Sequence, residues 1–477
     1  MNFDFELKKR KDKNLYVQLY DGLKEMIINK KFKENQKLPA IRKIANFFKV
    51  NTSTVVKAYD LLEKEGFIYK KTGSGCFISN LEIKNKKEIN DYDTKDFESF
   101  KYGQIQLHSN INFASSTPSI NLFPIKNFKK VINKVLDRDG GEAFTYQETQ
   151  GYYPLRDTIS KSLKDKNINS SADRIQIVSG AQQAIDILSK ILITPGDKIA
   201  VENPTYSGAI SSFKNRGAII QSFSIKNDGI DLNEFENFLK KNKIKFLYTM
   251  TNFHNPTGIK WSSKKKKTLL NLAIKYNFLI LEDDCLSELY FYNKEPLSLK
   301  SLDTENKVIY IKSYSKIFMP GLRLGFIILP EKLYIPTLAV KYATDISSSG
   351  LNQRAFELYL KEGYWNNHIQ TMKSLFKERF ELMLDLILKY NMNLYAKPQG
   401  GLYFWLKTNI KIEKVYKKAL KRGVSILPGS IFSLNNTSNY FRLSFATVEK
   451  NEIIKGMKIL NDIINNDEEK KTYFPIV

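Results

Sequence analysis

The chain is poor in the features on which several classes of protein depend. Only two cysteines occur in its 477 residues, Cys76 and Cys285, and they lie far apart and without metal-ligand spacing. A disulfide framework is therefore not expected, which fits a reducing compartment. The first residues lack the apolar core of a signal peptide, and no run approaches the roughly 18 apolar residues of a membrane span. These absences predict a soluble cytoplasmic protein with no membrane partner.

The composition is strongly basic. The 75 lysines and arginines against 50 acidic residues give a formal net charge of +25, which suggests a polyanionic partner such as nucleic acid. Lysine, asparagine and isoleucine are abundant throughout the chain, so biased coding also contributes to this charge. Hydrophobic content of 42% and aromatic content of 13% are ordinary for folded proteins. At this length we expect more than one domain.

The first eighty residues have the pattern of a small DNA-binding domain. Apolar residues recur at helical spacing in two segments, and a turn rich in capping residues opens a third helix that ends at Gly66. Two short apolar strands then flank the glycine-containing turn 71–75, as in a β-hairpin. The expected elements are helices at 15–29, at 39–48 and after 50–54, and strands at 67–70 and 76–79. This order predicts a winged helix-turn-helix domain over residues 11–80.

The motifs of this segment resemble those of the GntR family of bacterial regulators. The matching stretches are Leu38-Pro39-Ala40-Ile41-Arg42-Lys43-Ile44-Ala45, Val50-Asn51-Thr52-Ser53-Thr54-Val55, Glu65-Gly66-Phe67-Ile68 and Gly73-Ser74-Gly75-Cys76-Phe77-Ile78. The sequence departs from the family at Thr52, where arginine is usual, and at Cys76, where threonine is common. The resemblance implies binding to double-stranded operator DNA.

The candidate DNA contacts lie near the start of the second helix, at the third helix and in the hairpin. Arg42 is expected to contact a phosphate, and the other candidates to meet base edges or the DNA backbone. They are Asn51, Thr52, Ser53, Thr54 and Lys57 at the third helix, and Lys70, Lys71, Gly73 and Gly75 at the wing. A solvated face is the alternative for each side chain alone. The first eighty residues hold 17 basic against 9 acidic residues, and this net charge of +8 favours DNA binding.

The rest of the chain has the pattern of an α/β layered fold. Residues 81–108 are charged and polar, and we expect them to form a flexible linker. Over residues 109–470, short apolar runs then alternate with amphipathic helices, and polar residues follow the runs, where such folds bind ligands. The expected strands are 175–178, 198–201, 246–250, 278–281 and 308–311. The first strand leads into a turn at Gly180–Gln182 that can hold an anion, with an ordinary Ser-Gly turn before a helix as the alternative.

The fifth strand delivers a lysine among hydroxyl groups. In Ser313-Tyr314-Ser315-Lys316, a lysine held in a pocket can form a Schiff base with an aldehyde, and the hydroxyls together with Arg323 suit a phosphate. Pyridoxal phosphate carries both groups, so the stretch is interpreted as a cofactor anchor. A surface lysine is the alternative when Lys316 is considered alone.

A metal site is the alternative for the carboxylates that follow the fourth strand. Asp283 and Asp284 are adjacent, but His254 is the only nearby histidine and no ligand spacing appears. We therefore predict no bound metal.

From about Asn112 to Ala446 the chain resembles fold-type I pyridoxal phosphate enzymes, specifically class I and II aminotransferases. The resemblance implies a large and a small subdomain and the cofactor pyridoxal 5'-phosphate. It implies that Lys316 is the Schiff-base lysine and that Asp283 pairs with the pyridine nitrogen. It further implies that Asn255 bonds the ring oxygen and Tyr206 stacks on the ring. The residues implied to bind the phosphate are Gly180, Ala181, Gln182, Ser313 and Arg323.

Three more positions bear on function through this resemblance. Tyr146 resembles the tyrosine that reaches the phosphate of the neighbouring subunit, which implies a homodimer. Arg442 matches the arginine that clamps a substrate carboxylate, a bidentate task for which lysine is poorly suited; a structural ion pair is the alternative. Cys285 stands among the cofactor-binding residues, where the family generally has a tyrosine that assists the ring oxygen. A thiol is the weaker hydrogen-bond donor.

The two resemblances occur in the order found in MocR-type bacterial transcription regulators. They imply a regulator that senses pyridoxal phosphate, or an amino compound through it, because a ligand that prefers one state shifts the protein toward that state. One alternative is an aminotransferase with an appended DNA-binding module, since Lys316, Asp283 and Arg442 leave half-reactions open. The other is a cofactor-free binding module on an aminotransferase scaffold.

Overall fold

The computed structural model describes residues 3, 5–7, 14–29, 31–32, 35–65, 67–71, 74–79, 110–292, 294–434 and 438–469. The chain divides into two compact units, Met1–Thr94 and Lys95–Val477. The predicted linker at 81–108 lies outside the described residues, as do Gly73 of the predicted wing and the outermost residues of the predicted domains. Within the described part of the chain, no helix is long and apolar enough to cross a membrane.

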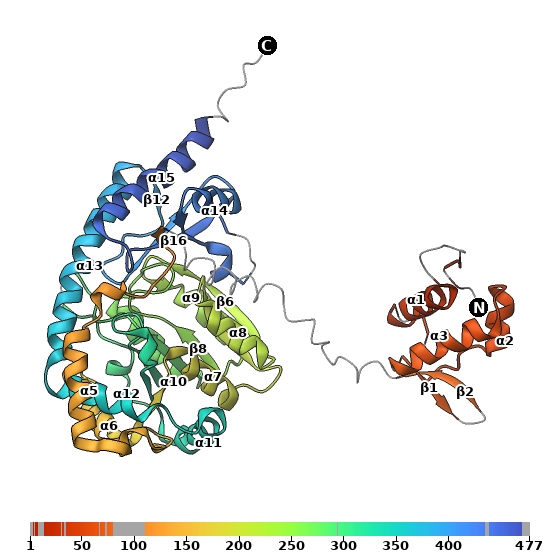
Figure 1. The fold of residues 1–477 in the computed structure, drawn as a ribbon, viewed down its shortest axis with the longest axis horizontal. Coiled ribbons are helices and arrows are strands. Elements are labelled where there is room, and N and C mark those ends of the chain that lie inside the picture. The colour runs from red at the N-terminus through yellow and green to blue at the C-terminus, as the bar shows by residue number, and fades with distance from the viewer. Residues whose placement is uncertain are drawn as a thin grey trace, which may run out of the picture. The chain divides into compact units, whose positions relative to one another are not determined.

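The described residues of the N-terminal unit form three helices and an antiparallel hairpin (Figure 1). The elements are α1 (Leu15–Ile28), α2 (Ile41–Phe47), α3 (Thr52–Lys64), β1 (Ile68–Lys71) and β2 (Gly75–Ile78). The apolar helix faces meet in one core that includes Leu23, Ile44 and Leu62. The hydroxyl of Tyr59 in α3 donates to the Pro39 carbonyl at 2.8 Å and so ties α3 to the entry of α2. The predicted winged helix-turn-helix arrangement is present.

Several helix boundaries differ from the prediction, since α1 ends at Ile28 rather than at 29 and α2 ends at Phe47 rather than at 48. The helix predicted at 39–48 begins at Ile41, because Ala40 is still extended, with ψ of 144°. The turn between α2 and α3 is shorter than the predicted 50–54. Asn51 caps α3, because its side chain accepts a hydrogen bond from the Ser53 amide, and the helix begins at Thr52. Thr52, Ser53 and Thr54 therefore form the first turn of α3.

A mostly parallel eight-stranded sheet forms the centre of the C-terminal unit. Only β11 and β7 run antiparallel to their neighbours. In sheet order the strands are β4 (Ile175–Val178), β11 (Gly325–Ile328), β10 (Val308–Ser313), β9 (Leu279–Asp284), β8 (Phe246–Thr249), β5 (Lys198–Asn203), β6 (Ile219–Lys226) and β7 (Gly229–Ile230). The sequence predicted that the fourth strand ends at 281, whereas β9 continues through Asp284, because its pairing with β10 extends to Asp284 and Lys312.

Helices cover both faces of this sheet. Ile309 and Ile311 of β10 pack into a core with one set of helices, whereas Val308 joins another, because successive side chains of a strand point to opposite faces. The first set is α7 (Ala181–Leu192), α8 (Ser207–Asn215) and α11 (Tyr334–Asp345), and the second is α9 (Leu232–Leu239) and α10 (Ser263–Lys275). The predicted α/β layers are confirmed.

The remaining helices of the large subdomain pack together beside this sheet. They are α5 (Ile125–Asp139), α6 (Tyr153–Lys164) and α12 (Gly350–Lys361). The small subdomain has a four-stranded antiparallel sheet and three helices. Its elements are β12 (Asn393–Leu394), β13 (Tyr403–Lys407), β16 (Tyr440–Ser444) and β15 (Leu427–Pro428), with α13 (Tyr364–Lys389), α14 (Ile412–Lys421) and α15 (Lys450–Glu469). A separate parallel pair joins β3 (Ile111–Asn112) to β14 (Val424–Ser425).

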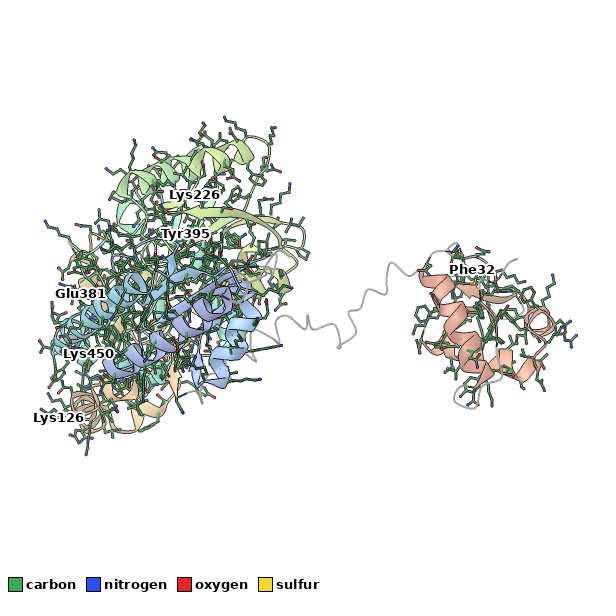
Figure 2. All side chains as sticks on the ribbon, turned by 90° about the horizontal axis from the view of Figure 1, so that it is seen from above. Phe32, Lys126, Lys226, Glu381, Tyr395 and Lys450 are labelled. Carbon is green, nitrogen blue, oxygen red and sulfur yellow. The ribbon has the colours of Figure 1, made fainter. Side chains whose placement is uncertain are left out.

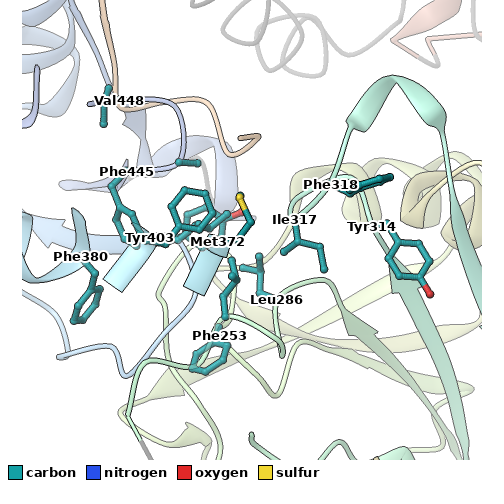
Figure 3. Close-up of a cluster of buried hydrophobic side chains, with 14 of the residues drawn as sticks. Phe253, Leu286, Tyr314, Ile317, Phe318, Met372, Phe380, Tyr403, Phe445 and Val448 are labelled. Carbon is teal, nitrogen blue, oxygen red and sulfur yellow. The ribbon is translucent and has the colours of Figure 1, made fainter. Parts of the chain in front are cut away.

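The two subdomains share a continuous apolar core. Phe380 and Tyr403 of the small subdomain belong to the same buried cluster as Phe253 and Leu286 of the large one (Figure 3). The hydroxyl of Tyr395 adds a polar tie, since it donates to the Ile225 carbonyl of β6 at 2.6 Å (Figure 2). This packing holds the loops at the carboxyl ends of the strands against the small subdomain.

Candidate functional site

The start of α3 presents polar side chains to solvent. Oδ1 of Asn51 accepts from the Ser53 amide at 3.2 Å, and this cap leaves Thr52 and Ser53 exposed on the first turn, with Thr54 half-buried. Lys57 is exposed one turn later, with its ammonium 5.7 Å from the ring centre of Tyr16. The positions are those of a recognition helix whose first turns meet DNA.

Arg42 is exposed in the first turn of α2. The N-terminus of this seven-residue helix carries amides without intrahelical partners, and a guanidinium beside it is well suited to meeting a phosphate.

The two lysines of the wing differ in their surroundings. Lys70 is held by two carboxylates of α3, at 2.8 Å from Asp60 and 2.6 Å from Glu63. Lys71 is exposed at the end of β1, and no ion pair joins it to another described residue. Gly75 opens β2 with φ of +110°, in the region that favours glycine. Of the two lysines, Lys71 is therefore the better placed for a DNA phosphate.

One pocket of about 160 Å³ in the C-terminal unit collects most of the predicted cofactor residues. Its lining consists of Ala181, Gln182, Tyr206, Met250, Asn252, Phe253, Asn255, Asp283, Cys285, Leu286, Ser313, Ser315, Lys316, Arg323 and Tyr403. Of the predicted cofactor residues, only Gly180 and Tyr146 are missing from it. Gly180 packs against Arg323 of the lining, since a Cβ added at Gly180 would lie 2.9 Å from Nη2 of Arg323. Tyr146 is 81% exposed and lies away from this pocket.

Asp283 is buried at the end of β9 and accepts two hydrogen bonds. The Tyr248 hydroxyl donates to its Oδ2 at 2.7 Å, and the Cys285 thiol donates to its Oδ1 at 3.0 Å. Burial raises the pKa of Asp283, and these two hydrogen bonds oppose that rise. Burial also raises the pKa of the Cys285 thiol well above its usual value, so the thiol stays protonated and can donate.

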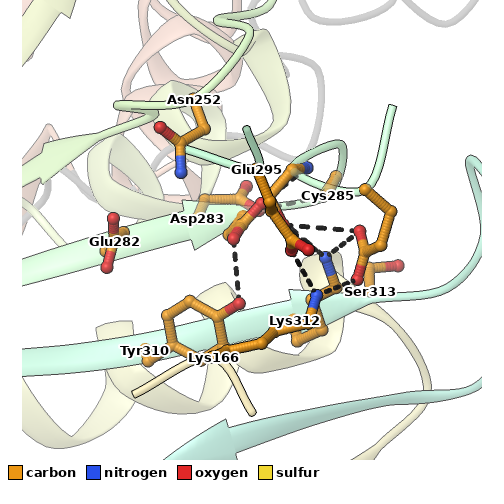
Figure 4. Close-up of polar contacts among 12 residues, drawn as sticks. Lys166, Asn252, Glu282, Asp283, Cys285, Glu295, Tyr310, Lys312 and Ser313 are labelled. Atoms are coloured by element: carbon orange, nitrogen blue, oxygen red, sulfur yellow. Dashed lines mark hydrogen bonds and ion pairs between the residues drawn. The ribbon is translucent and has the colours of Figure 1, made fainter. Parts of the chain in front are cut away.

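The adjacent carboxylate has different partners, Tyr310 and Lys312, which are labelled in Figure 4. Asp284 accepts from the Tyr310 hydroxyl at 2.9 Å, and Nζ of Lys312 lies 3.7 Å away. Lys312 also donates to Glu288 at 2.6 Å in a buried ionic cluster behind the pocket. Asp283 and Asp284 therefore belong to separate networks. Among the described residues, no group of histidine, cysteine and carboxylate side chains could hold a metal ion.

Lys316 carries a buried amine at the centre of the pocket. Burial lowers the pKa of Lys316 to about 8, and the positive charge of Arg442 contributes to that shift. Its Nζ donates to Oγ of Ser116 at 2.5 Å. A lysine whose pKa lies near neutrality holds a substantial fraction of free amine, which is the form that attacks a carbonyl.

Arg442 is buried beside the lysine and is held by uncharged groups. Its Nη1 donates to Oδ1 of Asn255 at 2.8 Å, and its Nη2 donates to the Ala114 carbonyl. The guanidinium lies 4.6 Å from the ring centre of Tyr403. Its Nε is buried without a hydrogen-bond partner, and neither of its other nitrogens pairs with a carboxylate of the described residues. This donor set suits an incoming carboxylate.

The turn between β4 and α7 forms a cradle for an anion. Gly180 has φ of +89°, and α7 begins at Ala181, so the first amides of a 12-residue helix point away from its end. Arg323 completes the cradle, with its Nη2 donating to the Ser179 carbonyl and its Nη1 to Oγ of Ser315 at 3.3 Å.

The predicted ring-stacking residue also touches this cradle. The hydroxyl of Tyr206 donates to Oε1 of Gln182 at 3.0 Å, and the Gln182 amide donates to the Gly208 carbonyl and to Ser212. The side chain of Gln182 is thus engaged in hydrogen bonds within the protein. Its backbone amide remains the group available to a phosphate.

Several residues of the site were missed in the sequence. Tyr248 could have been noticed as a single hydroxyl in the apolar strand 246–250. Ser116 and Ala114 had no signal, because they come from a loop about 200 residues before Lys316 and are brought to it only by the fold. Tyr403 and Asn252 also line the pocket without a local motif that marks them.

Comparison with known proteins identifies both units. Residues 109–460 match the family Aminotransferase class I and II, and residues 15–78 match the gntR family of bacterial regulatory proteins. Both predicted resemblances are therefore confirmed.

The similar proteins divide by how much of the chain they cover. The uncharacterized HTH-type transcriptional regulator YdfD of Bacillus subtilis is 32% identical over 95% of this chain and 96% of its own length. Aromatic-amino-acid aminotransferase 1 of Thermococcus litoralis is 31% identical over 76% of this chain and 89% of its own length. The crystal structure of Pyrococcus horikoshii kynurenine aminotransferase in complex with PMP matches with a TM-score of 0.75 and 28% identity, over 81% of this chain and 98% of that one.

The relative named as a regulator thus matches both units, whereas the two aminotransferases match less of the chain. The chain belongs to the class I and II aminotransferase family, and its N-terminal GntR-family domain gives it the domain organisation of the MocR-type transcription regulators.

Proposed function

We propose that this protein is a cytoplasmic transcription regulator that binds operator DNA through its N-terminal unit and senses pyridoxal phosphate, or an amino compound through it, in its C-terminal pocket. The observation that carries the proposal is the presence in one chain of a GntR-family domain and a lysine pocket that gathers most of the expected cofactor residues, with a relative of matching length named as a transcriptional regulator.

The residues of the pocket fit pyridoxal phosphate, the cofactor of this aminotransferase family. Asp283 supplies a buried carboxylate for a pyridine nitrogen, and the cradle at Gly180 and Arg323 supplies amides and a guanidinium for a phosphate. When bound, the cofactor supplies an aldehyde for amines and a ring that withdraws electrons. The residues that would hold it are Lys316, Asp283, Asn255, Tyr206, Gly180, Ala181, Gln182, Ser313, Arg323 and Cys285.

Each side chain then has a defined task. Lys316 offers its amine to the aldehyde, and Asp283 keeps a proton on the ring nitrogen. Asn255 meets the ring oxygen, and because it also accepts from Arg442, it connects the ring to the site for a ligand carboxylate. The Cys285 thiol donates to Asp283, and as a weaker donor than the tyrosine usual at this position it would give less support to a ring oxygen.

A homodimer is part of the proposal. Tyr146 is exposed beside Phe144, which is 69% exposed, and Ile120 is 76% exposed. Exposed apolar side chains of this size favour a protein partner. In the dimer that the aminotransferase resemblance implies, Tyr146 would reach the partner's phosphate site. Sedimentation equilibrium tests this: a dimer is expected, and a monomer at micromolar concentration would contradict it.

The DNA target can be found by footprinting the region upstream of the protein's own and neighbouring genes, with and without pyridoxal phosphate. Protection that changes on addition of the cofactor is expected. Protection that is identical under both conditions would contradict sensing but leave DNA binding intact.

A catalytic role is the second candidate, because Lys316, Asp283 and Arg442 together leave an aminotransferase half-reaction open. Purified protein can be incubated with amino acids and keto acids and the products measured over many turnovers. Turnover at the rates of ordinary enzymes, about 1–1000 per second, would favour the enzyme. Conversion limited to a single half-reaction would favour the regulator.

A further inference from the structure

The first described segment of the C-terminal unit contacts Lys316 of the pocket from outside its lining. After β3 the chain continues through Phe113, which is fully buried; its amide donates to the Ser425 carbonyl at 3.0 Å and its carbonyl accepts from the Ser444 amide at 2.7 Å. Ala114, Ser115 and Ser116 follow, and the Thr117 carbonyl then accepts from the Thr447 hydroxyl at 3.1 Å. Residues 114–116, which we call the reporter segment, are thus anchored at both ends.

The reporter segment contacts two cationic groups, Lys316 in the lining of the pocket and the buried Arg442. Oγ of Ser116 accepts from Nζ of Lys316 at 2.5 Å, and the Ala114 carbonyl accepts from Nη2 of Arg442. These are the groups that the proposed function assigns to a ligand aldehyde and a ligand carboxylate. In the structure described here, three consecutive residues hold both of them.

A ligand at these groups competes with the reporter segment. An amine that condenses with an aldehyde exchanges two N–H bonds for one C=N bond and releases one water, so Lys316 could no longer make the same contact to Ser116. A carboxylate at Arg442 forms charge-assisted hydrogen bonds, which are stronger than the bond to the neutral Ala114 carbonyl. Occupation of the pocket therefore removes contacts that hold the segment.

The segment has a direct covalent route to the DNA-binding unit. Only Asn110 to Phe113 separate it from residues 81–109, which lead to the N-terminal unit in the sequence. No other described residue that contacts Lys316 or Arg442 lies so near this connection: Asn255 and Tyr403 are more than 140 residues further along the chain.

We propose that residues 114–116 report occupation of the pocket to the DNA-binding unit: ligand contact with Lys316 and Arg442 releases the segment, and its rearrangement changes DNA affinity. The inference rests on the proposed function and names the residues that couple its two sites. Because coupling between two binding sites is reciprocal, bound DNA also changes the affinity for pyridoxal phosphate by the same factor.

The test compares two neighbouring serines in the full-length protein. Ser116→Ala removes the contact to Lys316, whereas Ser115→Ala removes a hydroxyl that lies 3.1 Å from the Thr117 hydroxyl and does not contact the lysine. The dissociation constant for fluorescent DNA carrying the footprinted site is measured without and with saturating pyridoxal phosphate, at one salt concentration. The response is the ratio of these two constants. Cofactor loading is followed by absorbance.

The wild type and Ser115→Ala are expected to show the same response, within the roughly 5–150-fold range of allosteric couplings. Ser116→Ala is expected to bring the ratio toward one. Its cofactor-free form already lacks the hydrogen bond between residue 116 and Lys316, so cofactor binding has no such contact to break. An unchanged ratio in Ser116→Ala, with a clear response in the wild type, would overturn this inference and leave the proposed function standing. A ratio of one in the wild type would overturn the proposed function, and the inference with it.

A second measurement, made on the wild type without DNA, tests the inference even if Ser116→Ala folds poorly or binds little cofactor. Hydrogen exchange on the wild type compares peptides spanning 113–117 before and after addition of pyridoxal phosphate. The amides of Ala114 and Ser115, which now donate to Oδ1 of Asn112 at 3.1 and 2.9 Å, are expected to exchange faster on loading. Exchange that is unchanged or slower would overturn the inference.

Ser116→Cys, similar in size and a weaker hydrogen-bonding group, is expected to give an intermediate DNA response.

Discussion

The hydroxyl of Tyr248 donates to Oδ2 of Asp283 at 2.7 Å, and both side chains are buried from solvent. The bond favours the ionised carboxylate, against the burial that raises the pKa of Asp283. Tyr248 comes from the strand beside Asp283, so the sheet itself fixes the donor. The charge on Asp283 therefore depends on a residue one strand away.

Tyr248→Phe is expected to weaken binding of pyridoxal phosphate. Loss of a hydrogen bond to a charged group costs about 1.5–3 kcal/mol, which corresponds to about 10–150-fold in affinity. Absorbance titration measures the dissociation constant. Tyr310→Phe is the control, because that hydroxyl bonds Asp284 outside the pocket lining. Equal affinity for Tyr248→Phe and the wild type would refute the role of Tyr248.

Capture of pyridoxal phosphate by Lys316 is expected to depend on pH. The pKa of Lys316 is lowered to about 8, so the amine is mostly protonated below this pH and mostly neutral above it. Because the neutral amine is the nucleophile, the capture rate should rise about tenfold from pH 7 to pH 9. Stopped-flow absorbance measures this rate, with Lys316→Ala as the control for signals from elsewhere. A flat profile would mean that the amine titrates outside this range.

The wing should bind DNA through Lys71 more than through Lys70. Lys70 is already paired with Asp60 and Glu63, whereas Lys71 is exposed. Lys71→Ala is expected to reduce DNA affinity more than Lys70→Ala does, as measured by fluorescence anisotropy at fixed salt. If Lys70→Ala has the larger effect, its ion pairs with α3 must break when DNA binds.

Arg42→Ala is expected to weaken binding to the operator and to unrelated DNA by similar factors. A phosphate contact carries no sequence information, and its loss should reduce the slope of log affinity against log salt by about 1. Lys126→Ala removes an exposed charge of the C-terminal unit and serves as the control. A loss confined to the operator would instead assign Arg42 to base recognition, and unchanged affinity would remove it from the interface.

Local sequence signals predicted the α/β layers, the hairpin and the lysine anchor, whereas the resemblance to known families supplied most of the other residues of the pocket wall. Helix and strand periodicity, glycine turns and the lysine stretch are short-range features, and the residues that follow the strands meet at one edge of the sheet because parallel strands end there. The ends of β9 and β10 were predicted too early, since continued pairing between neighbouring strands decides them rather than hydrophobicity.

Contacts between distant segments could not be predicted in this way. Ser116 meets Lys316 across 200 residues, and Asn255 meets Arg442 across 187 residues. The partners of Lys70 on α3 depend on how the hairpin packs against that helix, which no local pattern encodes. These long-range contacts determine which groups of each motif are available to a ligand or to DNA, as for Lys316, Arg442 and Lys70.

The affinity for operator DNA with and without pyridoxal phosphate tests the central claim most directly, in the wild type and in Lys316→Ala. The wild type should change its affinity by about 5–150-fold when the cofactor is added, and Lys316→Ala should not respond. An equal affinity under both conditions in the wild type would contradict the account. An undiminished response in Lys316→Ala would contradict the role of the lysine.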